Sequence, residues 1–391
     1  MDKQLTGVLT LLRSALNGES LTVPHDFDWE QANQSFFQHH LVGLAFRGAM
    51  NCGISKTSPG FCQLTALFCK QIQEQRKQMQ ELQDVYDLLE EQAIDYIPLK
   101  GAVLKELYPQ EEMRFMGDAD LLIKIDQYPR IQKLLSQRGM QCHGRTDHHF
   151  EWQGENLALE LHISLMLSSD LVWFDYYRNI WEKALLSGHG NQYRLSAEDH
   201  FIYLVAHFAK HFCYGGITAK PLCDFWLYRR KYPHMDEDYL CGELEKLRLL
   251  PFYRKLMQLM QVWFAGAQPT PADEQLTRMI LKGGIMGEEE SAAAMNVLRS
   301  RKDVHTGSES KARAILLRAF PPFSAMVRRY RFLEAYPLLL PVAWLLRVGS
   351  IVRKPDKIRR NIQVTKYIRE DSQKLAGELQ AGLELAGLEI M

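Results

Sequence analysis

Apolar residues recur at helical spacing through the first part of the chain. One stripe runs from Leu5 to Leu16 and another from Leu82 to Leu89, with Gln, Glu and Lys between the apolar positions. Residues three and four apart share one face of a helix. The pattern therefore predicts an N-terminal helical section over residues 1–93, in which the polar-rich stretch 61–92 forms one or two helices packed on a surface.

The hydrophobic period changes in the next section, residues 94–168. Short β-like segments alternate there with helical ones: strands at 96–99, 118–125, near Phe150 and at 157–163, and helices at 102–107 and 128–138. Such alternation is typical of a small sheet with helices packed on it. We therefore predict an α+β protein, in which a small mixed sheet, with helices on one side, is embedded in a mostly helical chain.

Helical patterns return after Ser168. They predict a helical domain at residues 169–266 and a C-terminal helical section at 311–391. Between these, residues 267–310 are polar and contain Pro, Gly and Ser, which is typical of a loop or linker.

The longest apolar run extends from Tyr336 to Val352, and it contains two prolines and Arg347. A membrane-spanning helix needs roughly 20 clean apolar residues. We therefore expect no transmembrane segment; a buried helix is the favoured interpretation, and a helix lying at a membrane interface is the alternative. The N-terminus also lacks the uninterrupted apolar stretch of a signal peptide, so a cytoplasmic location is expected.

The overall charge excludes a dedicated polybasic protein. The chain has 47 Lys+Arg and 47 Asp+Glu, so no net field attracts nucleic acid, and no DNA partner is expected. Residues 328–366 are a local exception, with ten basic and two acidic side chains. This basic section forms either solvated helix faces or a contact surface for phosphate, RNA or an acidic partner. The seven cysteines are spread without CxxC spacing, which disfavours disulfides and thiolate zinc sites.

Two aspartates in the sheet region are the first candidates for chemistry. Side chains alternate along a strand, so Asp118 and Asp120 point the same way. Placing two carboxylates beside Met116 and Leu121 costs free energy unless a cation or hydrogen bonds compensate. Mg²⁺ prefers hard oxygen ligands and keeps positions open for phosphate oxygens. The pair therefore indicates a magnesium site, although acid pairs also occur on exposed strands and loops.

A third acid, Glu160, lies between leucines on a later strand. If that strand is a neighbour of the Asp118–Asp120 strand, the three carboxylates converge. Two Mg²⁺ ions about 3.5–4 Å apart would then clamp a triphosphate for in-line displacement. The alternative is that Glu160 simply faces water.

Residues 96–165 resemble the nucleotidyltransferase superfamily of the polymerase-β type, and more narrowly a largely uncharacterised bacterial nucleotidyltransferase family. The resemblance rests on Lys100-Gly101, Tyr108, Arg114, Gly117-Asp118-Ala119-Asp120 and Glu160-Leu161-His162, and it extends to His207, His211 and Asp224. It implies a sheet of nucleotidyltransferase type.

The resemblance also implies roles for these residues. Asp118 and Asp120 would ligate both Mg²⁺ ions, and Glu160 would complete the second metal site and help deprotonate the acceptor. The nucleotide phosphates would contact Lys100, Gly101, Arg114 and Gly117. Gly101 would open a helix whose free N–H groups face the triphosphate. The chain departs from the superfamily at Ala102, where a serine usually follows the glycine.

The histidines leave more than one interpretation open. His207 and His211 share a helix face, but Phe208 replaces the glutamate of a zinc protease, so they pack in the core, contact substrate or bind a metal. Asp224 either pairs with such a histidine or contacts substrate. His162 follows Glu160 by two residues and supports the metal site or simply packs. The doublets His39-His40 and His148-His149 are expected to point apart, which disfavours a joint metal site.

Together these patterns predict an Mg²⁺-dependent enzyme. It would move a nucleoside monophosphate from an NTP, with ATP the expected donor, to a hydroxyl or phosphate of a small molecule, a protein or RNA. No phosphate-loop, dinucleotide-binding or serine-hydrolase motif occurs, so kinase, dehydrogenase and hydrolase readings lose support. The alternative function is a nucleotide-sensing or scaffolding protein with little or no turnover.

Overall fold

The computed structural model describes residues 1–168, 170–188, 190–214, 217–283, 320, 323, 326, 330, 333, 336–352 and 372–388. The chain forms two compact units. The first consists of Met1–His211, Ile217–Ile285 and Leu385–Leu388, and the second of Phe212–Gly216, Met286–Glu384 and Glu389–Met391. Every predicted site residue, from Lys100 to Asp224, belongs to the first unit.

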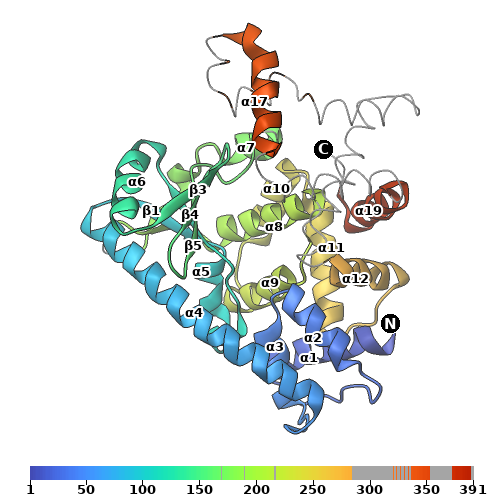
Figure 1. The fold of residues 1–391 in the computed structure, drawn as a ribbon. Coiled ribbons are helices and arrows are strands. Elements are labelled where there is room, and N and C mark those ends of the chain that lie inside the picture. The colour runs from blue at the N-terminus through green and yellow to red at the C-terminus, as the bar shows by residue number, and fades with distance from the viewer. Residues whose placement is uncertain are drawn as a thin grey trace. The chain divides into compact units, whose positions relative to one another are not determined.

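Helices make up most of the first unit (Figure 1). They are α1 (Lys3–Asn17), α2 (Trp29–Gln38), α3 (Val42–Asn51), α4 (Pro59–Glu91), α5 (Gly101–Leu104), α6 (Tyr128–Gln137), α7 (Leu171–Tyr177), α8 (Ala197–Tyr214), α9 (Lys220–Lys231), α10 (Glu237–Lys246), α11 (Leu250–Met260) and α12 (Pro271–Gly283). The first unit contains α8 as far as His211. Residues 61–91, predicted as one or two helices, lie within the single helix α4, which extends from the N-terminal helices to the sheet (Figure 1).

The sheet has five strands in the order β1-β2-β5-β4-β3. They are β1 (Tyr96–Leu99), β2 (Ala119–Ile123), β3 (Gln141–Arg145), β4 (His149–Gln153) and β5 (Ala158–His162). β2 and β5 are parallel neighbours, and the other pairs are antiparallel, so the sheet is mixed. A separate two-stranded sheet joins β6 (Leu185–Leu186) and β7 (Tyr193–Arg194). The hydrophobic pattern does not predict β3, because its side chains are mostly exposed and show no apolar alternation.

One face of the five-stranded sheet carries the core of the α+β region. Leu121 and Leu161 on the central strands pack with Leu88 of α4 and Ile131 of α6. Side chains alternate along a strand, so the residue that precedes each of these leucines, Asp120 or Glu160, points to the opposite face. The expected mixed sheet with helices on one side is confirmed, and the opposite face is left for Asp120 and Glu160.

The expected loop over residues 267–310 is wrong for its first part, where α12 forms. Thr270 and Asp273 make a reciprocal cap: the Thr270 N–H donates to Asp273 Oδ2 at 2.9 Å, and the Asp273 N–H donates to Thr270 Oγ1 at 3.2 Å. Pro271 is compatible with the first helical position because that residue has no intrahelical N–H bond to make. Residues 284–310 lie outside the described part.

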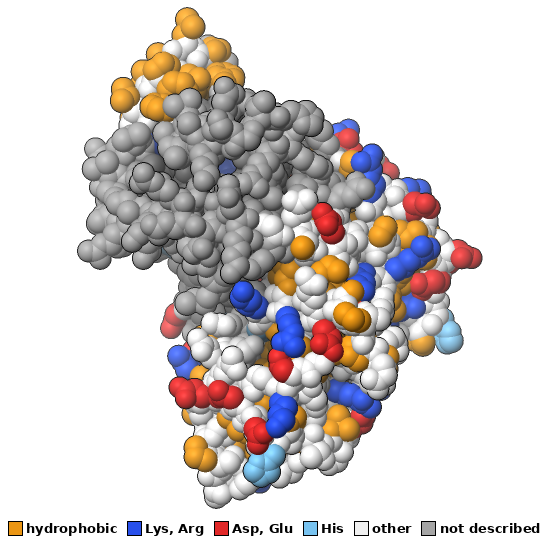
Figure 2. Space-filling model, turned by 90° about the vertical axis from the view of Figure 1, so that its right-hand side faces the viewer, with side chains coloured by type: hydrophobic (Ala, Val, Ile, Leu, Met, Phe, Trp, Pro, Cys, Tyr) orange, Lys and Arg blue, Asp and Glu red, His pale blue; other side chains and the backbone are white. Residues whose placement is uncertain are grey.

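In the second unit, α17 (Leu340–Val352) follows a short 3₁₀ turn, and α19 (Ser372–Ala386) lies mostly in this unit. The expected buried helix is wrong: Leu338 is 94% exposed and Leu345 71%, and of the described side chains in α17 only Ala343 is buried. Exposed hydrophobic side chains of this kind are orange in Figure 2. Most of the basic section 328–366 lies outside the described residues.

Within the described residues, helices are either too short or too polar to cross a bilayer.

Candidate active site

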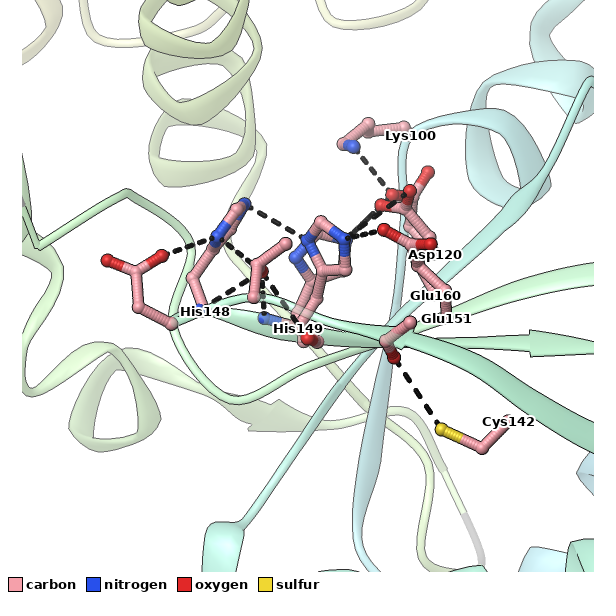
Figure 3. A network of polar contacts seen from close by, with 11 residues as sticks. Lys100, Asp120, Cys142, His148, His149, Glu151 and Glu160 are labelled. Atoms are coloured by element: carbon pink, nitrogen blue, oxygen red, sulfur yellow. Dashed lines mark hydrogen bonds and ion pairs between the residues drawn. The ribbon is translucent and has the colours of Figure 1, made fainter. Parts of the chain in front are cut away.

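Asp120 and Glu160 lie opposite each other on the parallel strands β2 and β5. Directly paired residues of neighbouring strands point to the same face. Their carboxylates meet at His162, whose Nε2 is 2.8 Å from Asp120 Oδ1 and 3.2 Å from Glu160 Oε2. Asp120 and His162 are each 2% exposed. The structure therefore brings these two acids together on the face opposite the core (Figure 3).

Asp118 stands one residue before β2 begins and is exposed to solvent. Loss of hydration next to the surrounding protein raises the pKa of Asp118 to about 6, and repulsion by the Asp120 and Glu160 carboxylates contributes to this increase. One set of three ligand atoms within 4.8 Å of one another comes from Asp120, Glu160 and His162. Asp118 is not part of this group of three, but the negative charges of Asp120 and Glu160 act on its carboxylate.

Lys100 supplies the positive charge next to these acids. Its Nζ donates to Asp120 Oδ1 at 2.5 Å. Burial alone would lower the pKa of Lys100, but the Asp120 carboxylate raises it overall, and burial of Asp120 is likewise outweighed by Lys100 and His162, which lower the Asp120 pKa. The Lys100 backbone has φ 42° and ψ −111°, a conformation that costs a non-glycine residue free energy and often occurs at functional sites.

Two further lysines, which the sequence patterns do not single out, interact electrostatically with the acids. Burial lowers the pKa of both Lys210 on α8 and Lys220 on α9 to about 8, with nearby Lys100 and Arg114 adding to this respectively. Asp120 attracts both ammonium groups. Lys210 could have been found, because it shares a helix face with His207 three residues earlier. Lys220 gave no such signal, since only the fold brings α9 to the sheet.

Arg114, predicted to contact phosphate, forms a buried ion pair with Asp224. It is 4% exposed, and its Nε and Nη2 donate to Oδ1 and Oδ2 of Asp224 at 2.7 and 2.9 Å. Its Nη1 donates to the Gly101 carbonyl at 3.2 Å, and Tyr108 Oη donates to Asp224 Oδ1 at 2.8 Å. This closed cluster of Arg114, Asp224 and Tyr108 holds the turn at Gly101 in place. All three nitrogens of the guanidinium donate hydrogen bonds within the protein.

The two glycines predicted to bind phosphate sit in different surroundings. A Cβ at Gly101 would lie 2.7 Å from Met116 Cγ, so the close packing of the Lys100 turn requires glycine there. A Cβ at Gly117 would meet nothing within 4 Å, and Gln78 of α4 donates to the Gly117 carbonyl at 3.1 Å. Helix α4 therefore fixes the loop that leads into Asp118, while Gly101 begins a helix of only four residues.

His207 and His211 lie together on α8, with ring centroids 4.6 Å apart. Burial lowers the pKa of His207 well below its ordinary value and that of His211 to about 3, and the charges of Lys100 and Lys210 act in the same direction. Both rings are therefore neutral near pH 7, and His211 also interacts electrostatically with Asp120.

The expectation that His148 and His149 point apart is wrong. His149 Nδ1 lies 3.1 Å from His148 Nε2 (Figure 3). The alternation of side chains applies only within a strand, and β4 begins at His149, so His148 is free of that constraint.

Comparison with known families gives one match that spans the site. The family model described as "Uncharacterised nucleotidyltransferase" matches residues 25–265, which include every site residue named above. Comparisons with curated proteins and with solved structures give no match. Since the match covers more than half of the chain, this protein belongs to that uncharacterised nucleotidyltransferase family.

Proposed function

We propose that the protein transfers a nucleoside monophosphate from an NTP, with ATP the expected donor, to a hydroxyl or phosphate of an acceptor, and releases pyrophosphate. The observation that carries this proposal is the pairing of Asp120 with Glu160 across parallel strands, with Asp118 beside them. The family supports the transfer of a nucleotide in general. The resemblance to polymerase-β-type enzymes suggests that these same acids hold metal.

The donor set fits magnesium. Asp118, Asp120 and Glu160 offer carboxylate oxygens, which hard cations prefer. Asp120 and Glu160 repel Asp118, and a divalent cation would relieve the repulsion that raises its pKa. Two bound Mg²⁺ ions would neutralise charge on the leaving pyrophosphate and make the acceptor oxygen more acidic.

The lysines of the site then contact the nucleotide. A cation at Asp120 would displace the Lys100 ammonium, which would be free to bind a phosphate oxygen. Lys210 and Lys220 add positive charge near the same acids, and their pKa values are lowered because burial outweighs the attraction of those acids. A triphosphate would supply the missing negative charge.

The acceptor would be held by the α8 side of the site. His207 and His211 lie there as neutral rings, and Tyr203 presents a buried hydroxyl that has no hydrogen-bond partner among the described residues. Neutral donors and acceptors suit a hydroxyl group better than a second phosphate. Asp224, in contrast, is already paired with Arg114, which in turn bonds the Gly101 carbonyl, so we assign Asp224 a structural role.

The test combines the full chain with Mg²⁺ and each NTP labelled at the α-phosphate. Pyrophosphate release and label on small molecules, RNA or the protein itself should appear, and EDTA should stop both. Asp118→Asn should abolish turnover, whereas Asp126→Asn, which removes an exposed carboxylate just after β2, should not. Tight NTP binding without product would favour the nucleotide-sensing alternative, and absence of NTP binding would overturn the proposal.

A further inference from the structure

Three buried imidazoles converge beside the acids. A ring nitrogen from each of His148, His149 and His162 lies within 4.8 Å of one from each of the others. The three residues are 5%, 8% and 2% exposed. They come from the start of β4 and the end of β5, whose antiparallel pairing places His149 directly opposite His162.

Each imidazole has an oxygen acceptor on its outer nitrogen. His148 Nδ1 is 3.2 Å from Asp147 Oδ1 and 3.0 Å from Thr146 Oγ1. His149 Nε2 is 3.3 Å from Glu151 Oε1, and His162 Nε2 is 2.8 Å from Asp120 Oδ1. A carboxylate can only accept, so these contacts favour the tautomer that carries its proton on the outer nitrogen of each ring.

The other nitrogen of each ring is therefore left with a lone pair. The lone pairs of His148 Nε2 and His149 Nδ1 face each other across 3.1 Å, and His162 Nδ1 is buried without a partner among the described residues. One shared proton would serve only two of the three nitrogens.

We propose that these three nitrogens, His148 Nε2, His149 Nδ1 and His162 Nδ1, bind a Zn²⁺ ion. Nitrogens on a tetrahedral zinc lie about 3.3 Å apart, close to the spacing already present between the first two. Carboxylates on the outer nitrogens orient zinc-binding histidines and increase their basicity, which is the role that Asp147, Glu151 and Asp120 have here. A water molecule would complete the coordination.

This zinc site is distinct from the magnesium site and does not depend on the proposed function. Imidazole nitrogens favour zinc, whereas the oxygens of Asp118, Asp120 and Glu160 favour magnesium. The two sites share His162, whose Nε2–H bonds Asp120. Zinc on Nδ1 would strengthen that bond by polarising the ring, so it would fix the position of the Asp120 carboxylate.

The test measures zinc on the full chain after metal removal, with Mg²⁺ in large excess to block the carboxylates. One Zn²⁺ per chain should bind, and X-ray absorption should show three imidazole nitrogens at about 2.0 Å. His148→Gln and His149→Gln should each weaken binding about 100-fold or more, since even loss of a supporting group costs about 10–100-fold. The matched control is His143→Gln, which removes an exposed histidine on β3 and should leave affinity unchanged.

Three results would overturn the zinc site: no stoichiometric zinc on the wild-type chain, wild-type zinc affinity in both histidine variants, or an absorption spectrum dominated by sulfur or oxygen. Asp118→Asn should keep full zinc affinity. A loss of zinc affinity in this variant would place the ion at the carboxylates instead. If the histidine variants do not fold, the absorption spectrum of the wild-type chain decides alone.

Discussion

Two charged clusters lie close together in this protein, and they differ in how completely their charges are matched. In the closed cluster, Arg114 and Asp224 form a two-point ion pair, and Tyr108 donates to the same carboxylate. In the open cluster of Asp118, Asp120 and Glu160, Lys100 bonds only Asp120, and Asp118 keeps a raised pKa.

The difference separates support from chemistry. A buried ion pair with its hydrogen bonds satisfied gains little from a ligand, and breaking it leaves an uncompensated charge. A group of carboxylates held together against their repulsion gains free energy when a cation arrives. The resemblance implies a phosphate contact for Arg114, and the structure shows its guanidinium paired with Asp224 in the closed cluster.

The largest expected effect is on the open cluster. Asp118→Asn should reduce Mg²⁺-dependent turnover by about 1,000-fold or more, because a metal ligand is lost. The melting temperature should stay the same or rise, since the variant removes repulsion between carboxylates. Parallel kinetics and calorimetry of this variant would test both. Wild-type turnover in the variant would mean that the acid is not a ligand.

The second prediction concerns the closed cluster. Arg114→Met leaves Asp224 buried without its cation and should destabilise the fold by about 3–5 kcal/mol. Urea unfolding measures this, with the exposed Arg138→Met as control. A variant of native stability whose KM for NTP is raised would restore the phosphate role of Arg114 and remove the contrast between the clusters.

A third prediction uses the pKa of Asp118, about 6 compared with its ordinary value of 3.8. Protons compete with metal for this carboxylate, so Mg²⁺ affinity should fall about tenfold per pH unit below 6. Calorimetric Mg²⁺ titration of the chain from pH 5 to 8 measures it, and Asp118→Asn should lose this dependence.

The same pKa predicts the stability of the metal-free chain. The folded state holds the Asp118 proton more tightly than the unfolded chain does, so this contribution to stability is present below about pH 4 and is lost as the pH rises through about 6. The melting temperature of the wild type relative to Asp118→Asn should fall over that range. A constant difference would show that the folded state does not raise the pKa of Asp118.

The smallest expected effect tests the support of the open cluster by α4. Gln78→Met removes the bond to the Gly117 carbonyl, and should cost about 1 kcal/mol of stability. Turnover should fall several-fold, because the loop before Asp118 loosens. Gln73→Met, on the exposed side of α4, is the control and should change neither quantity.

The convergence of Asp120 and Glu160 was predictable in part. Alternation along each strand put both acids among apolar neighbours, and the resemblance suggested that the strands meet. The contact between His148 and His149 was not predictable, because it depends on where β4 begins. The expected burial of α17 failed since apolar composition alone does not say whether a partner covers a helix.

The sequence by itself determined the α+β class, the apolar face of the sheet and the acids on its other face, because these follow from local periodicity. Only the tertiary structure decided which charges are already matched. It brought Asp224 to Arg114, and Lys210 and Lys220 to the carboxylates. These groups come from helices far along the chain, and a charge is neutralised by its neighbours in space, which no spacing in the sequence specifies.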